Sequence, residues 1–218
     1  MRVKTEERRQ AIIDVAAKVF REEGFDRASM SEIAKRLGGS KATLYSYFTS
    51  KEELFTAVMR QSPEVGDVFS RFTDPNAEIG SIAKLRENLE HFALGFLRLH
   101  LKPDVLAMRR NMIAEGDRSD VSRLAFEAGP RHNLTSLAAH LERAMQEGLI
   151  RKEVPWTAMS HLLGLVESEI VLPRLLGLIK EFPQEFIRAA ALRAVDAYLR
   201  AYALDEVKAP RKKEHAHS

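Results

Sequence analysis

The side chains best suited to binding chemistry gather in one short stretch, residues 40–51. Lys41 carries an ammonium group, and Thr43, Tyr45 and Tyr47 carry hydroxyl groups that can bond a base edge or a phosphate oxygen. A helix fits the major groove of B-DNA, and the residues at its N-terminal end reach the base edges. Lys41 is therefore the predicted base reader, because its ammonium can donate to O6 or N7 of guanine.

Smaller and capping residues complete the predicted DNA-binding set. Ala42 can contact a thymine methyl group, and Lys51 suits a phosphate. Ser29 and Ser50 cap helices whose free N–H groups attract phosphate oxygens, and Ser40 stands at the N-terminal end of the helix that reaches the base edges. The alternative for Tyr45 is a packing aromatic whose hydroxyl stays in water. The full set is Ser29, Ser40, Lys41, Ala42, Thr43, Tyr45, Tyr47 and Lys51.

Two short helices joined by a tight turn must position these residues. Ser29 with Glu32 forms a capping box that starts the first helix. Gly38 follows the last apolar residue of that helix, where a left-handed residue is favoured. Ser40 then caps a second helix over residues 41–48. A helix, a turn of about three or four residues that contains glycine, and a second helix form the helix-turn-helix pattern.

A helix over residues 5–21 precedes this unit, and its apolar stripe can cover Leu44 and Phe48. These two residues are accordingly expected in a three-helix core and not on DNA. Three basic residues near its start are open to either phosphate contact or solvation: Lys4, Arg8 and Arg9. Two more on the next helix are interpreted as a solvated face: Lys35 and Arg36.

The stretch around the turn resembles the DNA-binding domain of TetR-family transcriptional regulators. The resemblance extends over residues 4–59 and is carried by Ile33-Ala34-Lys35, Gly38, the run Ser40 to Phe48 and the run Ser50 to Leu54. It implies that Lys41, Thr43, Tyr45, Tyr47 and Lys51 lie on the DNA face. One departure is Gly39, where the family usually carries an apolar residue. The missing packing contact predicts a looser turn.

Sparse glycine and proline favour an all-α fold, and the resemblance implies its plan. An N-terminal three-helix helix-turn-helix head is followed by a larger helical ligand-binding and dimerisation body, about nine helices. The predicted divisions are a DNA-binding domain at 1–60, an effector-binding and dimerisation domain at 61–206, and a disordered tail at 207–218. Segment 63–76, which contains proline and glycine, is the predicted linker or long turn between the domains.

Composition narrows the class of protein. The 218 residues are 45% hydrophobic and 30% charged, and the net charge of +3 permits nucleic-acid binding without requiring it. Cysteine is absent, which excludes disulfides and thiolate catalysis. No signal peptide or membrane span is predicted, so a cytoplasmic protein is expected. No phosphate loop, paired-histidine zinc motif or nucleophile elbow is found, so we predict neither an enzyme nor any cofactor or metal.

The resemblance also implies a small apolar or amphipathic effector bound among the middle helices of the body. Such a pocket needs apolar walls and a few polar groups, for which Arg109 and Glu115 are further candidates. Glu167 is the most suggestive, because a buried carboxylate needs a partner, and an arginine of a second subunit would serve equally well. Each Met or Phe can also be plain core. The predicted ligand-binding set is Phe96, His100, Met108, Met112, Phe126, His132, Trp156, Leu163 and Glu167.

The last two predicted helices, at 155–176 and 184–204, are apolar nearly all round. Such a helix is usually buried on more than one side. This favours a homodimer in which both helices pack on their symmetry mates as a four-helix interface. The alternative is that they form the centre of the body. The predicted interface residues are Leu162, Val166, Ile170, Ala190, Ala194 and Tyr198.

The combined prediction is a sequence-specific DNA-binding regulator without membrane contact. By the resemblance, it is a repressor whose dimer binds a palindromic double-stranded operator and is released by a small molecule. A same-fold activator stays open, because that distinction depends on where the operator lies relative to the promoter. A helical protein-interaction module without DNA binding is the weaker alternative, since it would not require the residues at 41–51.

Overall fold

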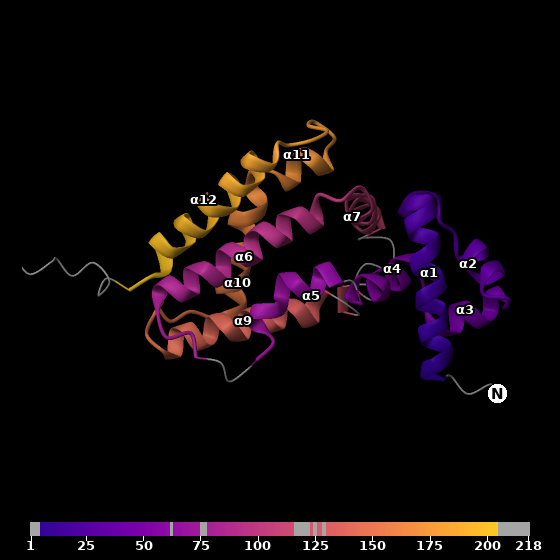
Figure 1. Ribbon diagram of the computed structural model, residues 1–218, viewed down its shortest axis with the longest axis horizontal. Coiled ribbons are helices and arrows are strands. Elements are labelled where there is room, and N and C mark those ends of the chain that lie inside the picture. Colours follow the sequence, from indigo (N-terminus) through magenta and orange to yellow (C-terminus); the bar gives the residue numbers. More distant parts are fainter. Residues whose placement is uncertain are drawn as a thin grey trace, which may run out of the picture.

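The chain folds into a helical head at one end and a larger helical body beside it (Figure 1). The computed structural model describes residues 5–61, 63–74, 78–115, 123, 126–127 and 130–204. Over these ranges no strand forms, which confirms the all-α prediction, and an isolated bridge joins Ile150 to Ala203. Within the same ranges, no helix is both long enough and apolar enough to cross a membrane. The predicted tail at 207–218 and the predicted phosphate contact of Lys4 lie outside the described residues.

The head consists of α1 (Glu6–Arg27), α2 (Met30–Arg36), α3 (Lys41–Tyr47) and α4 (Lys51–Arg60). Each helix starts with a side-chain cap, because Thr5, Ser29, Ser40 and Ser50 each accept the backbone N–H three residues further on. The starts predicted from Ser29 and Ser40 are confirmed. The turn between α2 and α3 contains Gly38 at φ 69°, a left-handed conformation that glycine adopts without a Cβ clash.

The body contains α5 (Pro63–Phe69), the short 3-10 helix η1 (Ser70–Phe72), α6 (Ile82–His100), α7 (Pro103–Glu115), α9 (Pro130–Gln146), α10 (Pro155–Ser168), α11 (Val171–Leu175) and α12 (Gln184–Tyr202). In Figure 1, α12 lies along α6 on one side of the body, and α9 lies on the opposite side. Helix α10 packs against both α9 and α12. Four helices begin with proline, whose missing N–H has no intrahelical partner at that position in any case.

Three predicted boundaries are wrong. The first helix was expected to end at residue 21, but α1 runs to Arg27 across a kink at Gly24, whose φ is 76°. Segment 63–76 was expected as a linker, but it begins with α5 and η1, and Phe69 buries its ring against α6. The helix expected over 155–176 breaks between α10 and α11. Pro173 explains the break, because it has no N–H for the carbonyl of Glu169 and its ring would clash with that carbonyl in a continuous helix.

Two hydrophobic cores stabilise the chain. The body core joins α5, α6, α9, α10 and α12, and Phe92 and Tyr198 are among its fully buried side chains. The head core joins α1 to α4 and contains Leu44 and Phe48, as the sequence predicts. It also takes three residues from α7 of the body: Val105, Ala107 and Met108. Helix α7 therefore belongs to the body by chain order but packs on the head.

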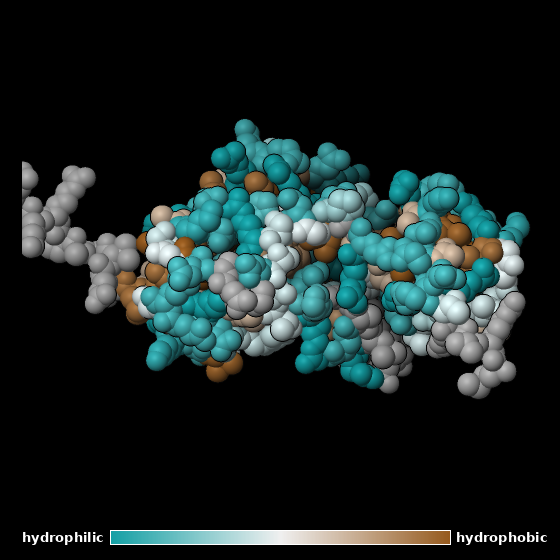
Figure 2. Space-filling model, turned by 60° about the horizontal axis from the view of Figure 1, so that its bottom comes forward, coloured by the Kyte–Doolittle hydropathy of each residue, from teal (hydrophilic) through white to brown (hydrophobic). Residues whose placement is uncertain are grey.

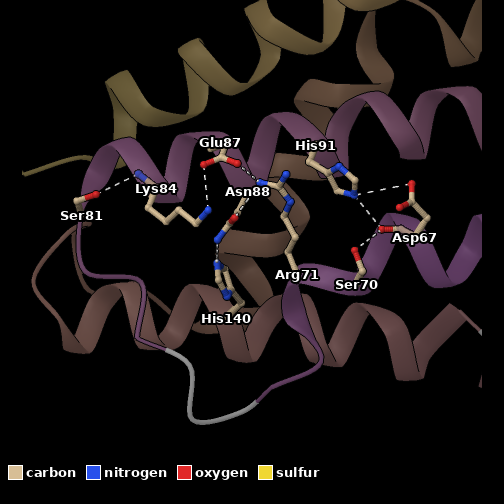
Figure 3. A network of polar contacts seen from close by, with 9 residues as sticks. All are labelled: Asp67, Ser70, Arg71, Ser81, Lys84, Glu87, Asn88, His91 and His140. Atoms are coloured by element: carbon tan, nitrogen blue, oxygen red, sulfur yellow. Dashed lines mark hydrogen bonds and ion pairs between the residues drawn. The ribbon is translucent and has the colours of Figure 1, made fainter.

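A polar network joins the α5–η1 segment to α6 and α9 (Figure 3). Arg71 donates to Oε1 of Glu87 at 2.7 Å and to Oδ1 of Asn88 at 3.2 Å. Nδ2 of Asn88 lies 3.5 Å from Nε2 of His140, which is buried. Burial and then the positive charge of Arg143 lower the pKa of His140 to about 4. The ring is therefore neutral at neutral pH, and the segment is held by a network built around an uncharged imidazole.

Candidate nucleic-acid interface and internal cavity

Helix α3 presents its predicted base-reading residues to solvent. Lys41 and Ala42 are exposed, and 47% of the surface of Tyr45 is accessible. Leu44 is fully buried in the head core. Because side chains radiate around a helix, one side of α3 anchors it to the head while the other is free to enter a groove. The ring of Tyr45 lies on the free side and not in the core.

Serine caps define where α2 and α3 begin. Oγ of Ser40 accepts the N–H of Thr43 at 3.1 Å, and the two side-chain oxygens lie 3.0 Å apart. Oγ of Ser29 accepts the N–H of Glu32 at 3.1 Å in the same way. Both serines are exposed, so these two helix starts lie at the surface of the head. Each cap fixes the start of its helix and therefore the direction of the side chains that follow it.

Tyr47 and Lys51, the remaining members of the predicted DNA-binding set, bond to other parts of the head. The hydroxyl of Tyr47 accepts the backbone N–H of Thr5 at 3.1 Å. The ammonium of Lys51 donates to the carbonyl of Phe25 at 2.8 Å and lies 4.4 Å from the centre of its ring. Lys51 thus holds the C-terminal end of α1, and a phosphate contact from it would compete with that bond.

Gly39 makes room for a basic side chain beside the turn. A Cβ added at Gly39 would lie 3.0 Å from Nη2 of Arg8, so a larger residue would displace this guanidinium. Arg9, next in α1, lies 5.1 Å from the centre of the Phe48 ring. The sequence indicated only a lost apolar contact at Gly39. The structure shows that the position brings a cation close to the start of α3.

Arg36, interpreted from sequence as a solvated residue, joins three carboxylates. Its guanidinium bonds Glu22, Glu23 at 2.7 Å and Glu32 at 2.8 Å. The hydrogen bond from Arg36 lowers the pKa of Glu32, and the same bond raises that of Arg36. This cluster ties α2 to α1. The spacing of Glu32 and Arg36 was a local signal for part of it, but the two α1 carboxylates are too distant in sequence for any periodic pattern.

A partly open cavity of about 260 Å³ is lined by residues of α4, α5, α6, α7, α9 and α10. Most of the predicted ligand-binding residues line it: Phe96, His100, Met108, Met112, Phe126, Leu163 and Glu167. The rest of its described lining comes from Thr56, Met59, Arg60, Val65, Phe69, Leu99, Val105, Arg109, Pro130, Asn133 and Leu134. The side chain of Glu115 lies outside the described part of the chain.

Two predicted ligand-binding residues, His132 and Trp156, do not line this cavity, and both are exposed. Trp156 is the second residue of α10, whereas α10 reaches the cavity through Leu163 and Glu167. Seven residues of helix place Leu163 about 10 Å further along the axis. His132 points away although its neighbours in α9 line the cavity. Residue type suggested both as ligand contacts. A residue lines the cavity, however, only if its turn and its face of the helix lie against it.

Helix α4 of the head and helix α7, which packs on the head, both line the cavity. Thr56 and Met59 line the cavity from α4, a helix that lies within the predicted DNA-binding domain at 1–60. Met108 of α7 lines the cavity and also belongs to the head core. At the start of α7, Oδ1 of Asp104 accepts the N–H of Phe25 at 3.3 Å. A change of packing around the cavity therefore acts directly on the helices that hold α3 in place.

Three polar groups of the cavity, Arg109, Glu167 and His100, together carry no net charge. Arg109 donates to both carboxylate oxygens of Glu167, at 3.0 and 3.1 Å, so the partner of Glu167 comes from the same chain. Nδ1–H of His100 donates to the carbonyl of Phe96 at 2.9 Å, and the two rings stack at 3.8 Å. Burial and then the charge of Arg109 lower the pKa of His100 to about 4. Its imidazole is accordingly neutral at neutral pH.

Comparison with known proteins agrees with this geometry. A model of the bacterial regulatory proteins of the tetR family matches residues 12–58, and one of the C-terminal domain of AefR-like transcriptional repressors matches residues 87–204. The chain belongs to the TetR family of transcriptional regulators. It is a helix-turn-helix, DNA-binding regulator of transcription, in a family whose members dimerise and bind small molecules. The family and the similar proteins are regulators and not enzymes.

Three similar proteins illustrate the relationship. The HTH-type transcriptional regulator UidR of Escherichia coli K12 is 29% identical over 167 residues, which cover 75% of this chain and 79% of UidR. A TetR-family transcriptional regulator from Mesorhizobium loti MAFF303099 is 27% identical, with a TM-score of 0.68 over 92% of this chain and all of that one, 100%. The flavonoid-responsive regulator FrrA is 28% identical, with a TM-score of 0.59 over 95% of this chain and 100% of its own.

The predicted dimer-interface residues of this TetR-family chain are all buried within the single chain. The structure leaves each of them between 0 and 5% exposed: Leu162, Val166, Ile170, Ala190, Ala194 and Tyr198. Side chains already buried within one chain offer no surface to a second chain. They form the centre of the body, which was the alternative interpretation of these helices.

Other apolar residues of α10 to α12 remain at the surface. They include Leu165, Leu172, Leu176, Leu178, Ile179, Phe186 and Leu192, which we call the apolar face. By contrast, the face of the molecule seen in Figure 2 is mostly hydrophilic, and its hydrophobic side chains show in small separate groups. Because so many exposed apolar side chains come from neighbouring elements of the chain, we treat them as a candidate interaction surface.

Proposed function

We propose that this chain is a dimeric repressor that binds a palindromic DNA operator and leaves it when a small molecule fills the cavity. The observation that carries the proposal is the position of the cavity, whose walls include α4 of the head and α7, the body helix that packs on the head. A ligand that changes the packing of α4 and α7 changes the placement of α3. Because its target is chromosomal DNA, we place its action in the cytoplasm. The alternative is an activator with the same machinery and a differently placed operator.

On DNA, we assign the base contacts to the exposed start of α3, with Lys41 as the principal reader and Ala42 and Tyr45 beside it. Arg8, which lies next to Gly39 in the turn, is assigned to a phosphate. Lys51 is assigned a supporting role, because its ammonium bonds the end of α1. The other proposed phosphate or base contacts are Ser29, Ser40, Thr43 and Tyr47.

The apolar face of α10 to α12 is the proposed dimer interface. Burying exposed apolar surface is worth roughly 25 cal/mol per Å², so a face of several large aliphatic side chains favours association. A two-fold dimer uses the same face on both subunits. It also presents two copies of α3, which suits a palindromic operator with half-sites about one helical turn apart or slightly more.

Release is proposed as a shift between two arrangements of the heads. A ligand favours the arrangement to which it binds more tightly, and only that difference in affinity can move the population. The methionines of α7, Met108 and Met112, can adapt to ligands of different shape. The similarity to FrrA, which is described as flavonoid-responsive, supports a small-molecule effector.

The test is to select genomic DNA fragments with the purified protein and then measure affinity for the enriched sequence at one fixed salt concentration. Lys41→Ala should weaken binding by about 10-fold or more, because a good base contact is worth roughly 1–3 kcal/mol. The matched control is Lys152→Ala, which removes an exposed lysine between α9 and α10 and should change affinity by less than about two-fold. Failure to enrich any sequence, or an unchanged affinity for Lys41→Ala, would contradict the proposal. Compounds that release the enriched DNA then identify effectors.

A further inference from the structure

Helix α7 carries two consecutive arginines that bond two different elements of the body. Arg109 donates to both carboxylate oxygens of Glu167, near the end of α10, at 3.0 and 3.1 Å. Arg110 donates from Nε to the carbonyl of Leu175 at 2.9 Å and from Nη2 to the carbonyl of Arg174 at 2.7 Å. Neighbouring residues of a helix point about 100° apart, so the two side chains reach separate partners. Together they fix α7 to the ends of α10 and α11.

The bonds from Arg110 are made at the end of a helix that a cation favours. Leu175 is the last residue of α11, and the last carbonyls of a helix have no partner in its regular bonding pattern. The aligned backbone dipoles also leave negative charge there, which attracts a guanidinium. Hydrogen bonds from a charged donor are stronger than those between neutral groups. Arg110 therefore holds α11 by its backbone, whatever side chains α11 carries.

The same helix is fixed to the head. Val105, Ala107 and Met108 of α7 are buried in the head core. At the start of α7, Oδ1 of Asp104 accepts the N–H of Phe25, a residue of α1, at 3.3 Å. In Figure 1, α7 lies between α1 and α11, and it contacts both of them. A head that moves relative to the body therefore moves α7, and α7 can move only against its bonds to α11.

Helix α11 belongs to the surface through which we propose that the chain dimerises. Leu172 of α11 and Leu176, which directly follows it, are members of the apolar face and are 59% and 62% exposed. A path of direct contacts therefore leads from the apolar face through α11, Arg110 and α7 to the head. Arg110 is not among the described residues that line the cavity, so this path is separate from the ligand site.

We propose that Arg110 is a positioning residue that sets the distance between the two heads of the dimer, and so the spacing of the half-sites that the dimer selects. This rests on the proposed function, because it requires two subunits joined at the apolar face and two heads on DNA. One base pair added between half-sites moves one of them by about 3.4 Å and turns it by about 34°. The heads can follow only if α7 moves against α11, which breaks the Arg110 bonds. Arg110 thus determines specificity without touching DNA.

The test uses the full chain and the DNA sequence that genomic selection enriches, in three duplexes. Their half-sites lie at the enriched spacing, one base pair closer or one base pair further apart, and affinities are measured at one salt concentration. The wild-type protein should prefer the enriched spacing by about 10-fold or more, which corresponds to one hydrogen bond from a charged group. Arg110→Met keeps a long side chain without donors and should reduce the preference to less than about three-fold. Arg110→Lys can still bond one carbonyl and should give an intermediate preference.

Two controls separate positioning from a general loss of structure. A duplex with a single half-site reports on the head alone, and Arg110→Met should bind it as tightly as the wild-type protein does. Light scattering should show that the variant is still a dimer. The matched substitution is Arg200→Met, which breaks an ion pair with Asp196 inside α12, in the last turns of that helix and at the end of the body away from the head (Figure 1). It should keep the wild-type preference for spacing.

Three results would overturn the role of Arg110 while leaving the proposed function intact. They are an Arg110→Met protein that keeps the full preference for the enriched spacing, one that binds all duplexes more weakly by the same factor, and one that is a monomer. A wild-type protein that binds the three spacings equally would also overturn it. A wild-type protein that enriches no DNA sequence, or that is itself a monomer, would instead contradict the proposed function, and the role of Arg110 with it.

Discussion

His140 makes the stability of this protein depend on pH in a way that one substitution can remove. The ring is 2% exposed, and burial lowers its pKa from the ordinary 6.5 to about 4. Because the folded value lies below the unfolded one, the unfolded chain takes up the proton first as the pH falls. Stability is therefore lost as the pH drops from 6.5 towards 4, and it is regained as the pH rises.

The size of the effect follows from the two pKa values. Between them, the unfolded chain binds one more proton than the folded chain, which corresponds to about 1.4 kcal/mol per pH unit. Going from pH 7 to pH 5, the contribution of His140 to the free energy of unfolding falls by about 2 kcal/mol. His100, whose pKa is also lowered to about 4, adds a term of the same sign.

Urea unfolding at pH 7 and pH 5, at one protein concentration, measures this loss. His140→Gln should lower stability at both pH values but reduce the difference between them by about 2 kcal/mol. The matched control is His132→Gln, which changes an exposed histidine of the same helix and should keep the wild-type difference. If the His140→Gln variant kept the full wild-type dependence on pH, the argument from burial would be refuted.

Two further predictions concern the head and the dimer. Leu44→Ala removes a fully buried side chain from the head core and should lower the free energy of unfolding by about 2–5 kcal/mol, as measured by urea unfolding. If Leu44 were exposed instead, the same substitution would lower the free energy of unfolding by less than roughly 1 kcal/mol. Leu192→Asp places a charge on the apolar face and should yield monomers in light scattering, whereas Ile113→Asp, at an exposed position on α7, should leave the dimer intact. A Leu192→Asp protein that stays dimeric would show that the subunits meet elsewhere.

The amino-acid sequence by itself determined where most helices begin. Ser29, Ser40 and Ser50 each bond an N–H three residues further on, and Pro103 and Pro155 occupy the first turn of their helices. These signals act within a single turn, so they are visible in a short window of sequence. The helix-turn-helix unit and its exposed Lys41 follow from the same local rules. That is why the head was predictable in detail.

Local patterns failed where a helix is apolar on every side. The period of 3.6 residues shows which side chains share a face of the helix. When every face is apolar, it does not show which face is buried in the core. In α10 and α12 the pattern therefore could not separate core from surface. Ala194 and Tyr198 were assigned to the interface and lie in the core, while Leu165 and Leu192 are the exposed residues.

Only the tertiary structure decided which residues from distant parts of the chain meet. Lys51 bonds Phe25, and Arg36 collects carboxylates from α1, although residue type alone indicated a phosphate contact for one and solvation for the other. The cavity likewise takes Thr56 from α4 and excludes Trp156, because helix packing selects the turns that face inwards. Helix starts depend on bonds within one turn, whereas sites depend on contacts between segments whose separation no periodic pattern records.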